Sequence, residues 1–176
     1  MKTWTIDSSH SSANFSLKHM MIAKVNGGFE KMSGTLQFDP QNPADLKVEA
    51  SIEAASINTR EHQRDTHLKS ADFFDVEKYP TLNFQSKEVQ PLSDGQFRIQ
   101  GDLTIHGVTK SVLLEVEGLS QELKDPWGNP RLGLSASTRI KRKEFGLTWN
   151  AALEAGGVLV GDDVTITLDV QFVRQA

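Results

Sequence analysis

The 176-residue chain contains no cysteine, and this absence removes several kinds of site at once. Without thiols there is no disulfide, no thiolate nucleophile, no zinc–thiolate centre and no iron–sulfur cluster. Basic residues are also outnumbered, since 19 Lys and Arg against 23 Asp and Glu give a formal net charge of −4. Nucleic-acid binding needs a basic face that neutralises phosphates, so we expect no nucleic-acid partner.

Long apolar runs are missing as well. No stretch approaches the roughly 18 apolar residues that a membrane-spanning helix needs, so we expect no membrane span. The segment Met1–Asp7 is not followed by the apolar region and small-residue cleavage site of a signal peptide. The sequence therefore predicts a cytoplasmic protein, or a periplasmic one if a leader has been removed. Its length and lack of repeats or linkers predict one domain over residues 1–176.

Helical periodicity is rare, and alternation of apolar and polar residues dominates instead. The alternating segments are 13–17, 32–38, 48–52, 82–86, 97–105, 112–116, 132–140 and 164–172. Each such strand has one dry and one wet face, as in antiparallel sheets. Closing about eight of them into a barrel leaves no free edge and an apolar interior. The sequence therefore predicts an all-β, antiparallel barrel of about eight strands.

Turn signals agree with this interpretation. Asp94-Gly95 and His106-Gly107 lie between alternating segments and suit tight hairpins. Gly27-Gly28, Gly156-Gly157 and Pro126–Pro130 are also typical of turns or loops. We predict that Pro126–Pro130 forms a loop at the rim of the barrel.

One polar segment, residues 58–74, breaks the alternation. Asn58 with Glu61 three residues later resembles a helix-opening capping pair. We predict a short helix over residues 60–68, in a helical segment near 60–69, and expect it to pack across the barrel. Phe73 and Phe74 should then return to the interior.

The sequence lacks the common motifs of catalytic, metal-binding and phosphate-binding sites. His62 and His67 lie five residues apart, which on a helix separates them by about 140° and makes a poor metal face. The chain has no H-E-x-x-H motif, no G-x-S-x-G nucleophile turn and no glycine-rich phosphate loop. We therefore expect no metal, no cofactor, no catalytic residue and no enzymatic activity.

Three features have two interpretations each. Arg64, Asp65 and His67 on the helix either bond the polar end of a ligand at the barrel mouth or are solvated. The charged stretch 139–144 is either a basic lip or a solvated hairpin, and charge patterning favours the hairpin. The large inward side chains either fill a core or line a cavity, because a packed and a hollow barrel alternate alike.

Several motifs resemble those of a known family. They include Trp4-Thr5-Ile6-Asp7, Lys18-His19-Met20, Arg64-Asp65-Thr66-His67-Leu68, Asp72-Phe73-Phe74-Asp75, the segment 101–110 and Gly161-Asp162-Asp163-Val164. The chain resembles the YceI-like proteins, which are bacterial lipocalin-like barrels associated with polyisoprenoid binding. The resemblance implies an eight-stranded lipocalin-like barrel with an elongated cavity. It also implies an amphiphilic ligand, such as a polyprenyl lipid, an isoprenoid quinone or a fatty amphiphile.

The inward faces and the helix together supply the predicted ligand-binding residues. These are Phe15, Leu17, His19, Met20, Phe29, Arg64, His67, Phe74, Phe84, Leu103, Ile105, Leu114, Phe145 and Trp149. We predict non-catalytic binding or carriage of one long apolar amphiphile, most simply a polyisoprenoid or isoprenoid quinone. Two alternatives stay open: a structural or stress-related barrel with a filled core, and an enzyme that uses Arg64, His67 or His19 on an isoprenoid-like substrate. A homodimer is compatible with each of these.

Overall fold

The computed structural model describes residues 1–151, 153 and 159–174, and nearly all of its regular structure is β-strand. The strands are β1 (Lys2–Ile6), β2 (Ser12–His19), β3 (Ala23–Phe29), β4 (Met32–Phe38), β5 (Lys47–Glu53), β6 (Ile57–Asn58), β7 (Thr81–Pro91), β8 (Phe97–Ile105), β9 (Val108–Glu117), β10 (Leu123–Lys124), β11 (Pro130–Lys141) and β12 (Asp163–Arg174). The helix α1 spans His62–Lys69, and the 3₁₀ turns are η1 (Ser8–His10), η2 (Pro43–Asp45), η3 (Ala54–Ser56) and η4 (Arg142–Phe145).

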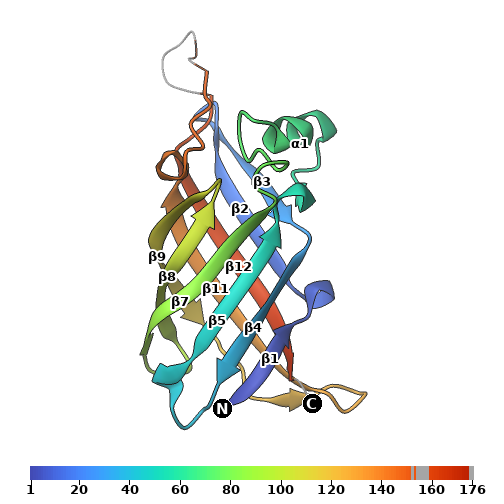
Figure 1. Cartoon of the computed structure of the whole chain (residues 1–176), viewed down its shortest axis with the longest axis vertical. Coiled ribbons are helices and arrows are strands. Elements are labelled where there is room, and N and C mark those ends of the chain that lie inside the picture. The colour runs from blue at the N-terminus through green and yellow to red at the C-terminus, as the bar shows by residue number, and fades with distance from the viewer. Residues whose placement is uncertain (152, 154–158, 175–176) are drawn as a thin grey trace.

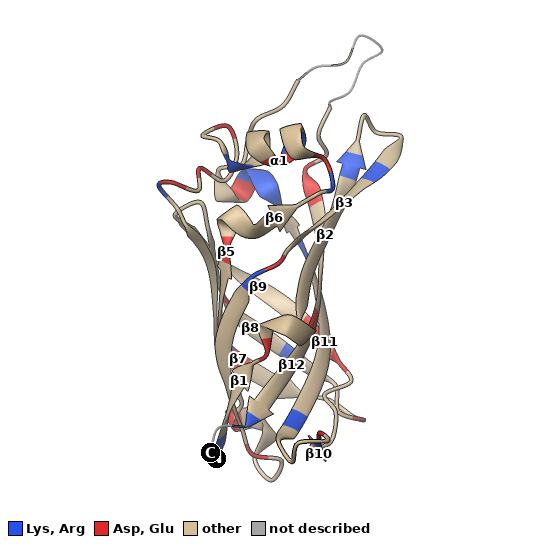
Figure 2. Cartoon of the chain, turned by 90° about the vertical axis from the view of Figure 1, so that its right-hand side faces the viewer, with Lys and Arg blue, Asp and Glu red and all other residues tan. Residues whose placement is uncertain are grey.

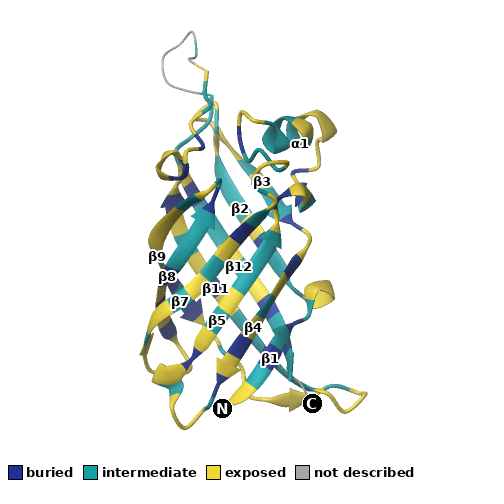
Figure 3. Ribbon diagram, in the orientation of Figure 1, coloured by how far each residue is buried: buried dark blue, intermediate teal, exposed yellow. Residues whose placement is uncertain are grey.

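Eight antiparallel strands close on themselves (Figure 1), in the order β11-β9-β8-β7-β5-β4-β1-β12 with β12 returning to β11. The closing pair is the longest, with register from Arg131↔Val173 to Lys141↔Asp163. The C-terminal part of β12 pairs with β1, and its N-terminal part pairs with β2 on the same side. β3 pairs with β2, and β6 pairs with β3, so these strands extend the wall. The predicted all-β antiparallel barrel is confirmed, and Figure 3 shows buried and exposed residues alternating along its strands.

The two ends of the barrel differ. At one end, which we call the closed end, β1 begins and β12 ends (Figure 1), and the buried side chains there include Trp4, Leu36, Phe38 and Phe97. The rings of Phe38 and Phe97 meet edge to face at 6.3 Å between centroids. The other end, which we call the mouth, carries α1, η4 and the β2–β3 hairpin. Among the described residues, no helix has the length and apolar character needed to cross a bilayer.

Both predicted tight hairpins are present. His106 (φ 55°) and Gly107 (φ 73°) form the two-residue turn between β8 and β9, flanked by the pair Ile105↔Val108. Asp94 and Gly95 also have positive φ, as such turns require. The loop containing Trp127 lies at the closed end, between β10 and β11, so it does not border the mouth.

The sequence-based prediction missed β1 and β3, and it wrongly placed a turn at Gly27-Gly28. Both glycines lie inside β3, opposite Phe15 and Asn14 of β2. A Cβ on Gly27 would lie 2.5 Å from Cζ of Phe15, so the glycine lets this ring pack directly on the backbone. Gly156-Gly157 lies outside the described residues.

The short helix is present, but its start differs from the prediction. Glu61 is the N-cap itself, and its carboxylate accepts from the backbone N–H groups of Gln63 (3.1 Å) and Arg64 (2.5 Å). Asn58 instead accepts from the backbone N–H of Arg60 (2.8 Å). The predicted capping pair is therefore wrong, because the acidic member caps the helix alone. Asp65 adds a second carboxylate to the first turn, where the helix dipole favours negative charge.

Candidate ligand cavity and its mouth

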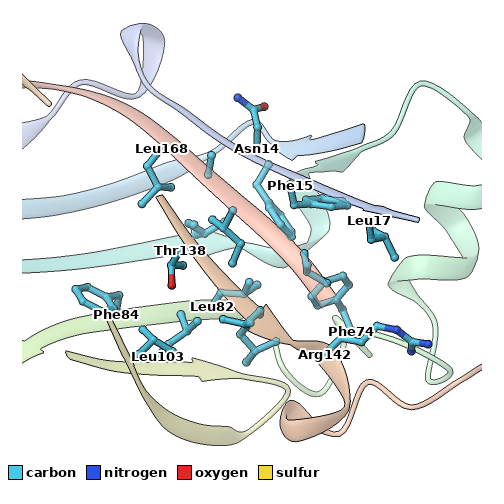
Figure 4. Close-up of a pocket in the computed structure, with 18 of the residues that line it drawn as sticks. Asn14, Phe15, Leu17, Phe74, Leu82, Phe84, Leu103, Thr138, Arg142 and Leu168 are labelled. Atoms are coloured by element: carbon cyan, nitrogen blue, oxygen red, sulfur yellow. The ribbon is translucent and has the colours of Figure 1, made fainter. Parts of the chain in front are cut away.

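A cavity of about 340 Å³ lies inside the barrel between the two ends (Figure 4). Its volume falls within the range of small-molecule sites. The wall is formed by inward side chains of β2, β4, β5, β7, β8, β9, β11 and β12, and nearly all of it is apolar. Side chains therefore do not fill this barrel, which contradicts the filled core of the structural alternative.

Strand alternation places the wall residues. Phe84 and Leu103 are directly paired between β7 and β8, and both face the cavity (Figure 4). Gly101 is buried beside them, and a Cβ there would lie 2.5 Å from Cζ of Phe84. The glycine thus gives the Phe84 ring room to lie against β8. Leu168 and Thr138 bring the facing strands β12 and β11 to the same chamber.

The helix α1 covers the mouth and carries a guanidinium on the cavity wall. Arg64 donates from Nε to the hydroxyl of Thr59 (2.8 Å) and from Nη2 to its carbonyl (2.7 Å). The buried Thr59 also bonds Asp65, through its backbone N–H (2.9 Å) and its hydroxyl (2.5 Å). Among the described residues Arg64 forms no ion pair, so its charge remains available to a ligand.

A cluster of three rings lines the cavity together with Arg64. His67 lies edge to face with both Trp149 (4.7 Å) and Phe73 (5.1 Å), and Phe73 and Trp149 are 5.4 Å apart. Nε2 of His67 is 2.8 Å from Oδ2 of Asp72, which fixes the imidazole plane. Phe74 packs beneath, edge to face with Phe29 at 5.7 Å. Phe73 and Phe74 both line the cavity, as predicted for this segment.

Arg142 is a second arginine of the wall, and it is only 3% exposed. Its guanidinium donates to four backbone carbonyls, those of Leu147 (2.6 Å), Gly161 (2.8 Å), Trp149 (3.0 Å) and Val160 (3.1 Å). Burial lowers the pKa of this guanidinium, and the nearby Asp162 acts in the opposite direction. Arg142 therefore holds the segments around 147–149 and 160–161 together at the mouth.

The prediction of a solvated hairpin over residues 139–144 was wrong at Arg142, which is buried. The even-numbered residues of β11 face inward, and the continuation of that parity from Ile140 places Arg142 inside as well. That parity was the signal available in the sequence. The neighbouring Lys141 and Lys143 are exposed, as a solvated stretch predicts.

The charged and imidazole groups of the wall gather at the mouth. Among described residues the wall contains Lys18, His19, Arg64, His67 and Arg142, but no Asp or Glu. The cavity is thus apolar along its length and cationic at one end, whereas the chain as a whole carries −4. Such an arrangement favours an apolar tail and an electron-rich head group.

Most of the predicted ligand-binding residues lie in the wall. These are Phe15, Leu17, His19, Phe29, Arg64, His67, Phe74, Phe84, Leu103, Ile105, Leu114 and Trp149. Met20 does not, because it lies in the turn after β2 and is 43% exposed. Phe145 is 1% exposed but packs among buried residues of the mouth without lining the cavity. Leu147 and Arg142 also line the wall, although neither was a predicted ligand-binding residue, and Phe73 was predicted only to be interior.

The fold and the cavity define a closed β-barrel with an axial apolar chamber. Residues 4–172 match the YceI-like domain, and the chain belongs to this family. A UPF0312 protein of Staphylococcus aureus is 36% identical over 174 residues, which cover 98% of each chain. BcnA of Burkholderia cenocepacia has a similar fold, with a TM-score of 0.82 and 23% identity over 94% of this chain and 98% of its own. A polyisoprenoid-binding domain from Saccharophagus degradans superposes with a TM-score of 0.73 and 15% identity, over 99% of this chain and 100% of its own.

Proposed function

We propose that this protein binds one long apolar amphiphile, with the tail along the barrel axis and the head group at the mouth. The observation that carries this proposal is the chemistry of the cavity, which is apolar along its length and cationic at the mouth. A polyisoprenoid or an isoprenoid quinone is the favoured ligand. Membership of the YceI-like family and the polyisoprenoid-binding relative support this choice.

The tail supplies most of the affinity. Large ligands realise about 0.3 kcal/mol per heavy atom, so a tail of about 30 atoms contributes roughly 9 kcal/mol, near micromolar or better. Each wall side chain contributes through contact area without directional bonds, so tails of similar length should bind comparably.

The head group sets the orientation of the ligand. Arg64 is held by Thr59 and has no carboxylate partner among described residues, so it can donate to an oxygen of the head group. His67 lies beside it, oriented by Asp72. A charged hydrogen bond adds up to about 3 kcal/mol, less than the tail supplies.

Binding without chemistry is the interpretation that the wall supports. Catalysis by a histidine would need a nucleophile or a second acid–base group that faces the ligand. In the described part of the chain, His67 bonds Asp72, which is exposed and lies outside the wall, and the wall contains no acidic side chain.

The test is mass spectrometry of organic extracts from detergent-free protein, together with native mass spectra of the intact sample. We expect one long-chain amphiphile per chain, removed by delipidation and regained from a polyprenyl lipid. Protein that is empty as isolated, and that gains no thermal stability from added polyprenyl lipid, would refute the proposal.

A further inference from the structure

We propose that the tip of the β2–β3 hairpin docks the mouth of the barrel onto an anionic lipid bilayer. The proposal goes beyond ligand binding and does not depend on it. It rests on three consecutive apolar residues at the tip, Met20 (43% exposed), Met21 (58%) and Ile22 (83%). No other point on the described surface exposes three large apolar residues in sequence.

The backbone of this turn works against such residues. The N–H of Ile22 donates to the carbonyl of His19 (3.2 Å), and both central residues have positive φ, 52° for Met20 and 61° for Met21. Asn and Gly are the residues that tolerate this geometry. Two methionines here therefore place large apolar side chains in solvent at a conformational cost. Such a strained and exposed feature is typical of a binding element.

The positive charge around the tip favours an anionic partner. Lys18 and Lys24 face each other across the hairpin just behind the tip, and both are exposed. Neither forms an ion pair among described residues, and the sequence contains no Asp or Glu between Asp7 and Glu30. Figure 2 shows this basic hairpin projecting beyond the body of the barrel. Positive charge on a net acidic protein complements an anionic surface.

The shape of the tip favours a bilayer over a protein partner. One narrow turn offers far less than the roughly 1,000 Å² that a specific protein interface buries. A convex apolar tip flanked by lysines suits the bilayer interface, where apolar side chains enter the acyl boundary and lysines reach the head groups. His19, the residue before the tip, already lines the cavity. Docking here would bring the mouth against the bilayer, so that an amphiphile need not cross water.

The experiment measures flotation of the full chain with vesicles. One set contains equal parts phosphatidylglycerol and phosphatidylcholine, and the other contains phosphatidylcholine alone. We expect binding to the anionic vesicles, weakened by salt, and little binding to the neutral ones. Ile22→Asp and Lys24→Glu should each lower binding by about tenfold or more.

Matched controls lie at the closed end. Trp127 is 82% exposed, close to the value for Ile22, and Lys124 is an exposed lysine of β10. Trp127→Asp and Lys124→Glu make the same changes of charge there and should leave vesicle binding unchanged. Thermal unfolding of each variant checks the fold. Extracts of Ile22→Asp should still contain the amphiphile, which separates docking from ligand binding.

Three results would overturn the proposal: no binding of the unmodified protein to anionic vesicles, equal binding to neutral ones, or equal losses in Ile22→Asp and Trp127→Asp. A dimer in sedimentation velocity that Ile22→Asp dissociates, without vesicle binding, would assign the tip to a protein contact and also overturn it.

Discussion

Nη1 of Arg131 donates to Oδ2 of Asp7 over 2.7 Å, and this bond joins β11 to the bend between β1 and β2. Nε of the same guanidinium donates to Asp125 over 2.8 Å. Asp7 also accepts from the hydroxyl (2.7 Å) and backbone N–H (3.1 Å) of Ser9, and lies 2.9 Å from Nδ1 of His10. Arg131, followed by Ser9 and His10, holds the pKa of Asp7 far below its usual range. Arg131 likewise lowers the pKa of Asp125 to about 2.

These carboxylates predict acid sensitivity at the closed end. Because their pKa values are depressed in the folded protein, the stabilisation is present above the unfolded pKa of about 4 and is lost as pH falls through the folded values. Asp7→Asn should lower the free energy of unfolding near pH 7 by about 2 kcal/mol, since it breaks charged hydrogen bonds. It should also flatten the decline of stability between about pH 5 and pH 2.

Urea unfolding at a series of pH values measures both effects. Asp94→Asn removes the same charge from an exposed turn and should leave the pH profile close to that of the unmodified protein. An unchanged acid decline in Asp7→Asn would show that the Arg131 pair does not carry the dependence.

Arg142 should be essential for the stability of the mouth. Arg142→Met removes the donors to four carbonyls and should destabilise the protein by about 3 kcal/mol or more. Arg142→Lys should rescue little of this, because an ammonium cannot reproduce the spread of a guanidinium. Thermal unfolding provides the measurement, and Arg139→Met, at an exposed position of the preceding strand β11, is the control. Full stability in Arg142→Lys would contradict this account.

Filling the cavity should expel the ligand. Leu103→Trp adds bulk in the chamber opposite Phe84, so we expect the amphiphile content of purified protein to fall at least tenfold, roughly the loss of a few buried methylenes. Leu113→Trp makes the same change on the outer face of β9, where Leu113 is 47% exposed, and should retain the ligand. Equal retention by both variants would place the ligand outside the chamber.

The side chain of Arg64 should contribute to the binding of the head group and not of the tail. Arg64→Gln should weaken a phosphate- or carbonyl-headed amphiphile by about tenfold to a hundredfold, the value of one charged hydrogen bond. A plain hydrocarbon of matched length should bind the variant and the unmodified protein alike. Fluorescence titration of Trp149, which lines the mouth, reports both ligands. Arg60→Gln is the control, because Arg60 is exposed and lies outside the wall. Equal loss for both ligands would show that Arg64 supports the fold of the mouth and not the head group.

Alternation along the chain was sufficient to predict the barrel and most of its wall, and the turn residues His106-Gly107 were sufficient to predict a hairpin. A period of two assigns each side chain to a face, so Phe84 and Leu103 point inward in any closed antiparallel arrangement. Of the missed strands, β1 shows the pattern only over the short stretch around Trp4 and Ile6, and β3 lacks it. Asn26, Gly27 and Gly28 make β3 resemble a turn in sequence. Only the tertiary contacts explain the glycines, because a Cβ on Gly27 would meet the ring of Phe15 and a Cβ on Gly28 would meet the side chain of Asn14.

The sequence by itself determined which strand residues face inward and that no thiol chemistry is available, because strand parity and side-chain type are local properties. Tertiary structure decided three other matters: that the inward residues leave a chamber, that Arg142 is buried, and that Met20 lies at an exposed tip and not in the wall. The physical reason is that a cavity and a buried charge depend on volumes and partners from strands far apart in the chain. Gly161 and Leu147 satisfy Arg142 only once β11 and β12 are paired around the closed barrel.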